Sequence, residues 1–526
     1  MDKSQGRVTR DAAETVALPP VVTASGHRGL VMDEKLIFEQ GVEGRCGVDL
    51  PEPPPVASRL GGLERKGPIG LPGLSEPQVI RHFTRLSQKN FAIDAGLYPL
   101  GSCTMKHNPR LNEKMARLPG FADVHPLQPV STVQGALAVM DELSRWLTTL
   151  TGMPAVALSP GAGAHGEYCG MVAIRAAIEA RGEAATRKRV LVPESAHGTN
   201  PATAAAIGFD VDPIPADAGG RVDVAALKAK LGPDVAAIML TNPNTCGLFE
   251  AEIVEIARLV REAGGYFYCD GANFNAIAGR VRPADLGIDA MHINLHKTFS
   301  TPHGGGGPGS GPVVFSARLA EFVPVPYLVR DGEGLSLVEH KADAPRSLGR
   351  LKGFHGQMGM FVRALTYMLS HGADGIRQAS NDAVLNANYV MARLQDVMTP
   401  SFAGPCMHEC LFDDRFLKDT GVTTLDFAKA MIDEGYHPMT MYFPLVVHGA
   451  MLIEPTESES KASLDLFIMT LRDLAFSVQK GETERFAGAP YLAPRRRLDE
   501  TRAARAPVLR WTKPKPIAAA NQLAAE

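Results

Sequence analysis

Between about residues 130 and 330, short apolar segments alternate with longer segments of helical periodicity. The apolar segments are AVALSP (155–160), RVLVPE (189–194), VAAIML (235–240), YFYCD (266–270) and MHINLH (291–296), and the helical ones include 133–152, 166–182, 223–232 and 250–265. Strand–helix alternation over this length predicts an α/β fold with a mostly parallel sheet covered by helices on both faces. Ligands of such sheets bind at the carboxyl ends of the strands, so polar residues that follow the strands are candidate site residues.

The pattern changes on both sides of this region. Residues 1–75 are rich in Pro and Gly, which predicts an extended arm, a floppy leader being the alternative. After residue 345, two long helical segments precede a strand, helix, strand, strand, helix pattern, which predicts a smaller α+β domain. We therefore predict an arm at 1–75, a large domain at 76–340, a small C-terminal α+β domain at 341–490, and a basic tail at 491–526 with a disordered end.

Composition excludes several classes of protein. The chain has 54 Lys and Arg against 57 Asp and Glu, which argues against a general nucleic-acid binder. The sequence has no apolar run of about 18 residues, so we expect no membrane segment. Seven cysteines without a CxxC pair indicate a reducing compartment, and we expect a cytoplasmic protein. Cys406, His408 and Cys410 alternate as in a strand, which we favour over a metal site.

Lys297 carries the strongest local signal. It follows an apolar strand, stands next to His296 and precedes a glycine-rich segment that contains Gly304–Gly307. A lysine surrounded by apolar residues is poorly solvated, which favours the neutral amine that forms a Schiff base. Taken alone, Lys297 fits an ordinary surface lysine at a strand end equally well.

Asp270 strengthens this interpretation. It ends the strand 266–270 and is followed by the small residues Gly271 and Ala272. A carboxylate at this place suits the pyridine nitrogen of pyridoxal phosphate, because the ion pair keeps the ring able to accept electrons. The alternative role for Asp270 is a helix N-cap.

Three further segments supply candidate cofactor contacts. SPGAGAHGEYCG (159–170) joins a strand to a helix, and the N–H groups of Gly163, Ala164 and His165 are placed to hold a phosphate. His197 follows the next strand and could stack on a cofactor ring or bond within its own turn. Thr241 and Asn242 end a strand and could bond the ring hydroxyl. Ala272 and His296, which adjoin Asp270 and Lys297, are further candidate cofactor contacts.

Several long motifs resemble the glycine decarboxylase P-protein family, and in particular the second (beta) subunit of its two-subunit bacterial form. The motifs are YPLGSCTMKHNPR (98–110), FADVHPLQP (121–129), GAGAHGEYCG (161–170), ESAHGTNPATAA (194–205), MLTNPNTCGLFE (239–250), YCDGANFNAIAG (268–279), NLHKTFSTPHGGGGPGSGP (294–312), YFPLVVHGAMLIEPTES (442–458) and RRRLDETRAARAPVLRW (495–511). The resemblance covers roughly residues 35–512. It implies the aspartate-aminotransferase-like fold (fold type I), with a seven-stranded sheet.

The resemblance also implies chemistry. Lys297 resembles the lysine that binds pyridoxal 5′-phosphate, Asp270 the partner of the pyridine nitrogen and His197 the stacking residue, while Ala164 and His165 lie in the phosphate turn. The implied reaction is glycine decarboxylation with transfer of the aminomethyl group to the lipoyl disulfide of H-protein. The implied partner is an alpha subunit, in an α2β2 assembly. Alternatives are another fold type I decarboxylase or lyase, or a non-catalytic subunit.

The basic segment around Arg495, Arg496, Arg497, Arg502 and Arg505 has two interpretations. It either docks a partner protein or forms a solvated basic face. The resemblance leaves the individual roles of Ser102, Cys103, Thr104 and Lys106 open.

Overall fold

The computed structural model describes residues 34–48, 50–303, 309–332 and 334–512. The predictions for the first 33 residues, for Gly304–Gly307 and for the end of the tail lie outside these residues. Contacts group the described chain into two compact units, one of 34–92 with 484–512 and one of 93–483. The domain boundaries expected from the sequence are not tested by this grouping and stay predictions.

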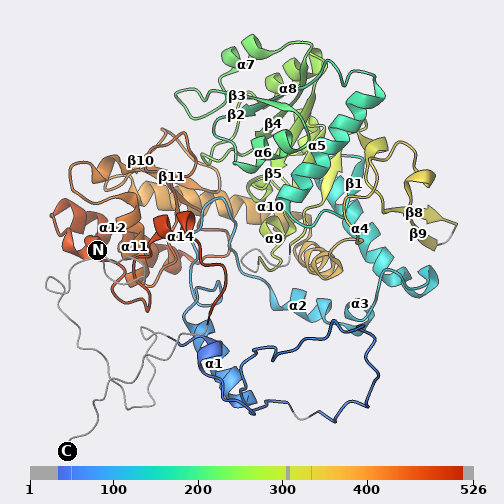
Figure 1. Cartoon of the computed structure of the whole chain (residues 1–526). Coiled ribbons are helices and arrows are strands. Elements are labelled where there is room, and N and C mark those ends of the chain that lie inside the picture. The colour runs from blue at the N-terminus through green and yellow to red at the C-terminus, as the bar shows by residue number, and fades with distance from the viewer. Residues whose placement is uncertain (1–33, 49, 304–308, 333, 513–526) are drawn as a thin grey trace, which may run out of the picture. The chain divides into compact units, whose positions relative to one another are not determined.

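A seven-stranded sheet forms the centre of the unit 93–483 (Figure 1). Its strands are β1 (Ala155–Ala157), β2 (Arg189–Pro193), β3 (Asp210–Ile214), β4 (Val235–Thr241), β5 (Tyr266–Gly271), β6 (Ala290–Ile293) and β7 (Val313–Phe315), in the order β1-β7-β6-β5-β4-β2-β3. The pairs β3–β2–β4–β5–β6 are parallel, whereas β7 runs antiparallel to β6 and β1. This confirms the predicted mostly parallel sheet.

Successive strand residues point to opposite sides of the sheet. Since these residues are apolar on both sides, helices cover both faces. On one face, Ile238, Phe267 and Met291 belong to a core that also contains buried residues of α4 (Gln134–Thr151), α8 (Ile253–Glu262) and α10 (Met358–Leu394). On the other face, Met239 and Tyr268 pack with α5 (Gly163–Ala180) and α6 (Thr199–Ala206). The remaining helices before residue 300 are α2 (Arg110–Ala116), α3 (Pro119–Ala122), α7 (Val224–Lys230) and α9 (Leu295–Thr298).

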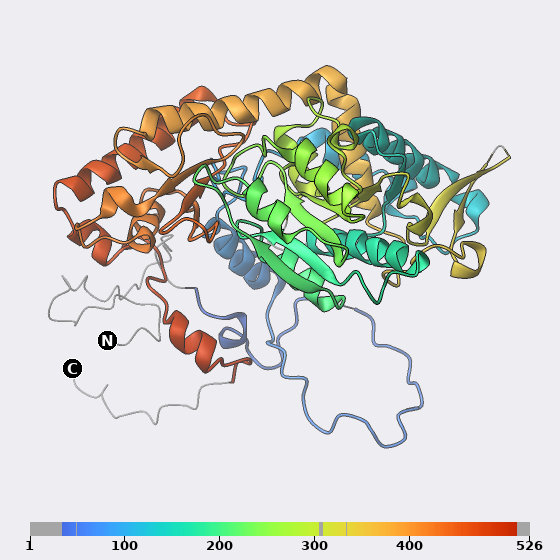
Figure 2. The same ribbon diagram turned by 90° about the horizontal axis from the view of Figure 1, so that it is seen from above.

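A second, antiparallel sheet follows the long helix α10 (Figure 2). This helix contacts α4, which packs on the large sheet, and strand β11 of the second sheet. Its order is β10 (Thr399–Pro400), β11 (Cys410–Asp413), β13 (Met451–Ile453) and β12 (Thr440–Met441), with helices α11 (Thr424–Asp433) and α12 (Lys461–Gln479). The two long helices expected from the sequence meet at a kink inside α10, where Gly372 has the non-helical angles φ 63° and ψ −176°. A two-stranded ribbon of β8 (Tyr327–Asp331) and β9 (Gly334–Val338) completes this unit.

Two local expectations are wrong. Cys406, His408 and Cys410 do not alternate along one strand, because β11 begins only at Cys410 and the residues before it form bends and loop. Lys297 does not stand at the tip of a strand, because β6 ends at Ile293 and Lys297 lies in the one-turn helix α9. Bends and loop thus take the place of the first residues of one apolar segment, and a one-turn helix takes the place of the last residues of the other.

The other unit contains α1 (Glu76–Gln88), α13 (Glu484–Ala487) and α14 (Glu500–Arg505). Ser75 and Gln78 form a capping box at the start of α1, and Arg85 forms a bidentate pair with the buried carboxylate of Glu34. In the parts of the chain that the structure describes, no helix is long and apolar enough to cross a bilayer. All seven cysteines of the chain lie in its described parts, and all are free thiols.

Candidate active site

Three neighbouring strands bring polar residues together at one edge of the large sheet. In the register of the sheet, Thr241 of β4 pairs with Asp270 of β5, and Asp270 pairs with His292 of β6. Because these strands are parallel, their carboxyl ends meet at the same edge. The strand-end residues predicted from the sequence therefore lie side by side.

Asp270 is a buried carboxylate held in one orientation. Its Oδ1 accepts the Ala272 N–H at 2.9 Å, and its Oδ2 accepts Asn200 Nδ2 at 3.1 Å. Burial raises the pKa of Asp270, but nearby His292, these hydrogen bonds and the charge of Lys297 outweigh burial and hold the pKa below its ordinary value. Asp270 is thus ionised at neutral pH. Ala272, a predicted cofactor contact, contributes by fixing this carboxylate.

Lys297 reaches the same edge from α9. Its side chain is buried, with 8% of the residue exposed, and its Nζ donates to the carbonyl oxygen of Ser102 at 2.8 Å. The charge of Lys297 lowers the pKa of Asp270, so the structure brings these two predicted residues near one another. The one-turn helix carries the amine over the sheet edge.

His197 lies in the turn between β2 and α6. Its Nδ1 accepts the Thr199 N–H at 3.2 Å and lies 2.9 Å from Thr199 Oγ1, so the turn fixes the ring. The ring remains exposed on its other side and meets Phe443 edge-on at 5.6 Å. Burial of the ring atoms lowers the pKa of His197 against the opposing effect of Asp270. A neutral, flat imidazole is therefore presented near both Asp270 and Lys297.

The predicted phosphate turn is the start of an 18-residue helix, α5, with Ala162 as its N-cap. The first N–H groups of a helix lack partners within the helix and carry partial positive charge, so Gly163, Ala164 and His165 offer donors to an anion. A side chain at Gly163 would force the buried Asn294 to shift, because its Cβ would lie 2.8 Å from Asn294 Oδ1. His165 Nδ1 accepts the Gly161 N–H at 3.1 Å, so the ring also shapes the turn.

The remaining predicted residues differ in how much of their bonding capacity is used. Thr241 Oγ1 is buried and has no partner among the described residues. Asn242 Oδ1 accepts the Glu250 N–H at 3.0 Å, so this side chain partly serves the following loop. His296 is half-buried, and burial lowers its pKa to about 3, so its ring is neutral next to Lys297.

Sequence reasoning missed three partners of these residues. His292 lies between Asp270 and Tyr268, with its Nε2 3.4 Å from Asp270 Oδ1 and its Nδ1 2.6 Å from the Tyr268 hydroxyl. Asn200 binds Asp270 from α6, and Ser102 supplies the carbonyl that receives Lys297. Of the three, only His292 could have been found from the sequence, because it lies in the predicted strand 291–296. In the sheet it pairs with Asp270 of the neighbouring strand β5.

Lys106, which the sequence left without a role, is a buried structural residue. Its Nζ pairs with Glu457 at 2.5 Å and donates to Asn275 Oδ1 at 2.9 Å and to the carbonyl of Thr298 at 2.8 Å. Burial lowers the pKa of Lys106, but Glu457 outweighs this and raises it overall, so the amine stays charged. Lys106 is therefore not a second reactive amine.

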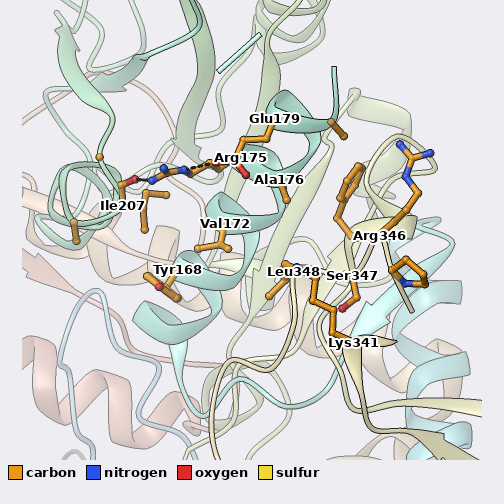
Figure 3. Close-up of a pocket in the computed structure, with 15 residues that line it drawn as sticks. Tyr168, Val172, Arg175, Ala176, Glu179, Ile207, Lys341, Arg346, Ser347 and Leu348 are labelled. Atoms are coloured by element: carbon orange, nitrogen blue, oxygen red, sulfur yellow. Dashed lines mark hydrogen bonds and ion pairs between the residues drawn. The ribbon is translucent and has the colours of Figure 1, made fainter. Parts of the chain in front are cut away.

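A separate hollow of about 710 Å³ lies between the outer side of α5 and residues 341–348 (Figure 3). Tyr168, Arg175 and Arg346 line it, and Arg175 is already bonded to Glu179 and to the Ile207 carbonyl. None of the predicted site residues lines this hollow. The strand-edge cluster is therefore the candidate active site.

Comparison with known proteins identifies the family of this chain. Residues 379–489 match a family model described as "Glycine dehydrogenase, C-terminal domain", and residues 169–307 match "Aminotransferase class-V". The chain is 68% identical over 528 residues to the probable glycine dehydrogenase (decarboxylating) subunit 2 of Caulobacter vibrioides, covering 99% of each chain. The chain belongs to the glycine dehydrogenase (decarboxylating) subunit 2 family. The protein of the same name from Listeria monocytogenes is 50% identical over 483 residues, which cover 91% of this chain and 98% of that relative.

A solved structure supports the fold of this family member. The inhibitor-bound crystal structure of a glycine decarboxylase (P-protein) of the glycine cleavage system superposes with a TM-score of 0.64 at 20% identity, covering 82% of this chain and 91% of that one. The likeness confirms the predicted aspartate-aminotransferase-like α/β fold. The name "subunit 2" implies that members of the family work with another subunit.

The match to the aminotransferase class-V family indicates pyridoxal 5′-phosphate as the cofactor, and the candidate site fits it. The start of α5 offers unpaired N–H groups to the phosphate, and ionised Asp270 suits the protonated ring nitrogen. The buried, unpartnered Thr241 Oγ1 is available to a polar group of the ring. Lys297 supplies a buried amine at the same edge.

Proposed function

We propose that this chain carries pyridoxal phosphate on Lys297, decarboxylates glycine and transfers the remaining aminomethyl group to the lipoyl disulfide of H-protein. The observation that carries the proposal is the convergence of Lys297, ionised Asp270 and the start of α5 at one sheet edge, in a chain 68% identical to a protein named glycine dehydrogenase (decarboxylating) subunit 2. When bound, the cofactor supplies an electron-withdrawing ring that accepts the electron pair left by the departing carboxyl group.

Each side chain then has a task that its surroundings support. Asp270 keeps the ring nitrogen protonated, with Ala272, Asn200 and His292 holding its carboxylate in place. Gly163, Ala164 and His165 hold the phosphate through backbone N–H groups at the start of α5. In this proposal Thr241 bonds the ring hydroxyl.

The histidines have supporting roles in the same proposal. His197, neutral and fixed by Thr199, stacks on the ring. His296 remains neutral beside Lys297 and leaves the lysine amine as the basic group there. Asn242 shapes the loop after β4 through its bond to Glu250 and borders the ring.

We propose further that the chain works in an α2β2 assembly with subunit 1, and that the assembly acts in the cytoplasm on lipoylated H-protein. Within the unit that contains α14, Arg497 bonds the carbonyls of Phe486 and Ala489, so it shapes the chain itself. Arg502 and Arg505 of α14 are exposed, and we propose that they face a partner. Sedimentation of the co-expressed subunits tests the stoichiometry, and cell fractionation tests the location.

The central experiment measures exchange of labelled CO2 into the carboxyl group of glycine and of other amino acids, with the two subunits assembled. We expect exchange with glycine alone, and loss of both exchange and visible cofactor absorbance in Lys297→Ala. The control is Lys188→Ala, an exposed lysine at the opposite end of β2, which keeps both signals. Wild-type exchange in Lys297→Ala, or exchange with a different amino acid instead of glycine, contradicts the proposal.

A further inference from the structure

Two carboxyl groups are completely buried next to the candidate active site. Glu409 and Glu454 are 0% and 1% exposed, and one oxygen of each lies within 4.8 Å of the other and of a ring nitrogen of buried His408. Among the residues that the structure describes, no Lys or Arg forms an ion pair with either carboxyl group. Two neighbouring carboxylates without a paired cation cannot both stay ionised in such a site.

Hydrogen bonds make the two carboxyl groups different from each other. The Ser102 N–H donates to Glu409 Oε1 at 2.5 Å, and because a backbone N–H can only donate, this oxygen must accept. The Thr104 hydroxyl donates to Glu454 Oε1 at 2.6 Å. The other oxygen of each group and both nitrogens of His408 are buried without a described partner. A hydrogen bond from the Glu454 side chain lowers the pKa of Glu409, which is the contact that a proton on Glu454 makes.

We propose that Glu409 and Glu454 share one proton, which Glu454 holds, and that the remaining negative charge on Glu409 positions the Ser102 turn against Lys297. Ser102 has φ 65°, a left-handed conformation that is unfavourable for a non-glycine residue and must be held by its surroundings. Its N–H is held by Glu409, and its carbonyl receives Lys297 Nζ. Glu409 is thus a positioning residue that acts on Lys297 through Ser102.

The electrostatics of the pair agree with this assignment. Burial, followed by the charge of Glu409, raises the pKa of Glu454 well above its ordinary value. Burial also raises the pKa of Glu409, but only to about 7, because the Ser102 N–H and Lys297 oppose it. Burial lowers the pKa of His408 to about 3, so its ring is a neutral acceptor. The charge of Glu457 also raises the pKa of Glu454. The charge of Glu409 in turn raises the pKa of the neighbouring thiols of Cys103, Cys246, Cys406 and Cys410.

The location of the proton is tested by infrared spectroscopy on the full chain, assembled with its partner subunit and loaded with pyridoxal phosphate, at pH 7. A protonated carboxyl group gives a carbonyl-stretch band that shifts in D2O. In difference spectra against wild type, we expect this band to be lost in Glu454→Gln and kept in Glu409→Gln. Each variant serves as the other's control for folding. Loss of the band only in Glu409→Gln, or no difference for either variant, overturns the assignment.

The link to Lys297 rests on the proposed function and has its own readout. Removing the charge of Glu409 lowers the pH midpoint at which the cofactor absorbance titrates, by roughly one unit, because a nearby anion favours a protonated nitrogen. Glu454→Gln replaces the proton donor with an amide donor, so its midpoint stays near that of wild type. Equal midpoints in both variants refute the link. If no cofactor is bound, the proposed function fails, while the infrared result still decides the proton's location.

A bound cation is the competing explanation for three polar side chains in one buried place. It would require both carboxylates to be ionised, with His408 as the third ligand. Elemental analysis of the same purified assembly decides between the two. We expect no stoichiometric divalent metal, and one metal ion per chain that disappears in His408→Ala overturns the shared proton.

Discussion

The ammonium group of Lys106 lies 2.8 Å from the carbonyl oxygen of Thr298, the residue directly after Lys297. The same ammonium forms a buried ion pair with Glu457 in the segment after β13. Lys106 therefore joins the segment before α2, the one-turn helix of Lys297 and the small sheet into one rigid site. Its role is to fix the backbone on which Lys297 stands.

Lys106→Met should lower the free energy of unfolding of the chain by about 3–5 kcal/mol, because it leaves Glu457 buried without its cation. Glu457→Gln should cost a similar amount. The double variant Lys106→Met/Glu457→Leu should recover part of the loss, since neither charge then remains buried. Denaturant unfolding measures these differences. A loss below about 1 kcal/mol for the single variants would show that the pair is solvated.

Asp270→Asn should lower the rate of glycine decarboxylation by about 10²–10³-fold, because the ring nitrogen loses the charge that stabilises its proton. The depressed pKa of Asp270 fixes the pH behaviour. The stability that its charge provides is complete above the unfolded pKa of about 3.9 and is lost as pH falls through the lower folded pKa. Wild-type cofactor binding should therefore not titrate through Asp270 above about pH 5. Retained activity in Asp270→Asn excludes this role.

Much of this site follows from the sequence because it depends on chain periodicity. Strands β4, β5 and β6 are apolar segments of parallel-sheet type, so Asp270 and Thr241 had to meet at one edge. The small residues 161–164 likewise indicated a strand-to-helix turn. Strands β3 and β7 were not predicted, because DVDPI is polar at the sheet edge and VVF has only three residues.

Apart from His292, the partners of the site residues could not be predicted, because they come from distant segments. Ser102 reaches Lys297 over 195 positions and Glu409 over 307 positions. No local sequence pattern encodes such a pairing. The left-handed conformation at residue 102 was also not predictable, because a serine and not a glycine occupies this position. The one-turn helix that carries Lys297 was also not predicted, because the apolar residues after β6 continue the pattern of the strand.

His197→Ala should weaken pyridoxal phosphate binding about 2–10-fold, the effect of losing one aromatic contact of about 0.5–1.5 kcal/mol. His197→Phe should restore most of the affinity, because a flat ring remains while the imidazole nitrogens are removed. Fluorescence titration of the assembled apoenzyme with the cofactor measures both constants. If the Phe variant is as weak as the Ala variant, His197 acts through its bond to Thr199 and not by stacking.

Glu167→Gln should change the pH dependence of stability, because burial, followed by the charge of Asp270, raises the pKa of Glu167 to about 8. The folded chain then keeps this proton up to about pH 8, whereas the unfolded chain releases it near pH 4.3. Unfolding between these values releases a proton, so the contribution of Glu167 to stability falls as pH rises, by up to about 1.4 kcal/mol per pH unit.

Glutamine cannot release a proton, so the stability of Glu167→Gln relative to wild type should increase from pH 5 to pH 8. Thermal unfolding at several pH values measures this difference, and any constant cost of the weaker bonds to Thr199 and Thr203 cancels in the comparison. Arg175→Gln, on the exposed side of the same helix, should show no such pH trend. A difference between Glu167→Gln and wild type that does not change with pH would mean that Glu167 is ionised beside Asp270, which two facing buried carboxylates do not permit.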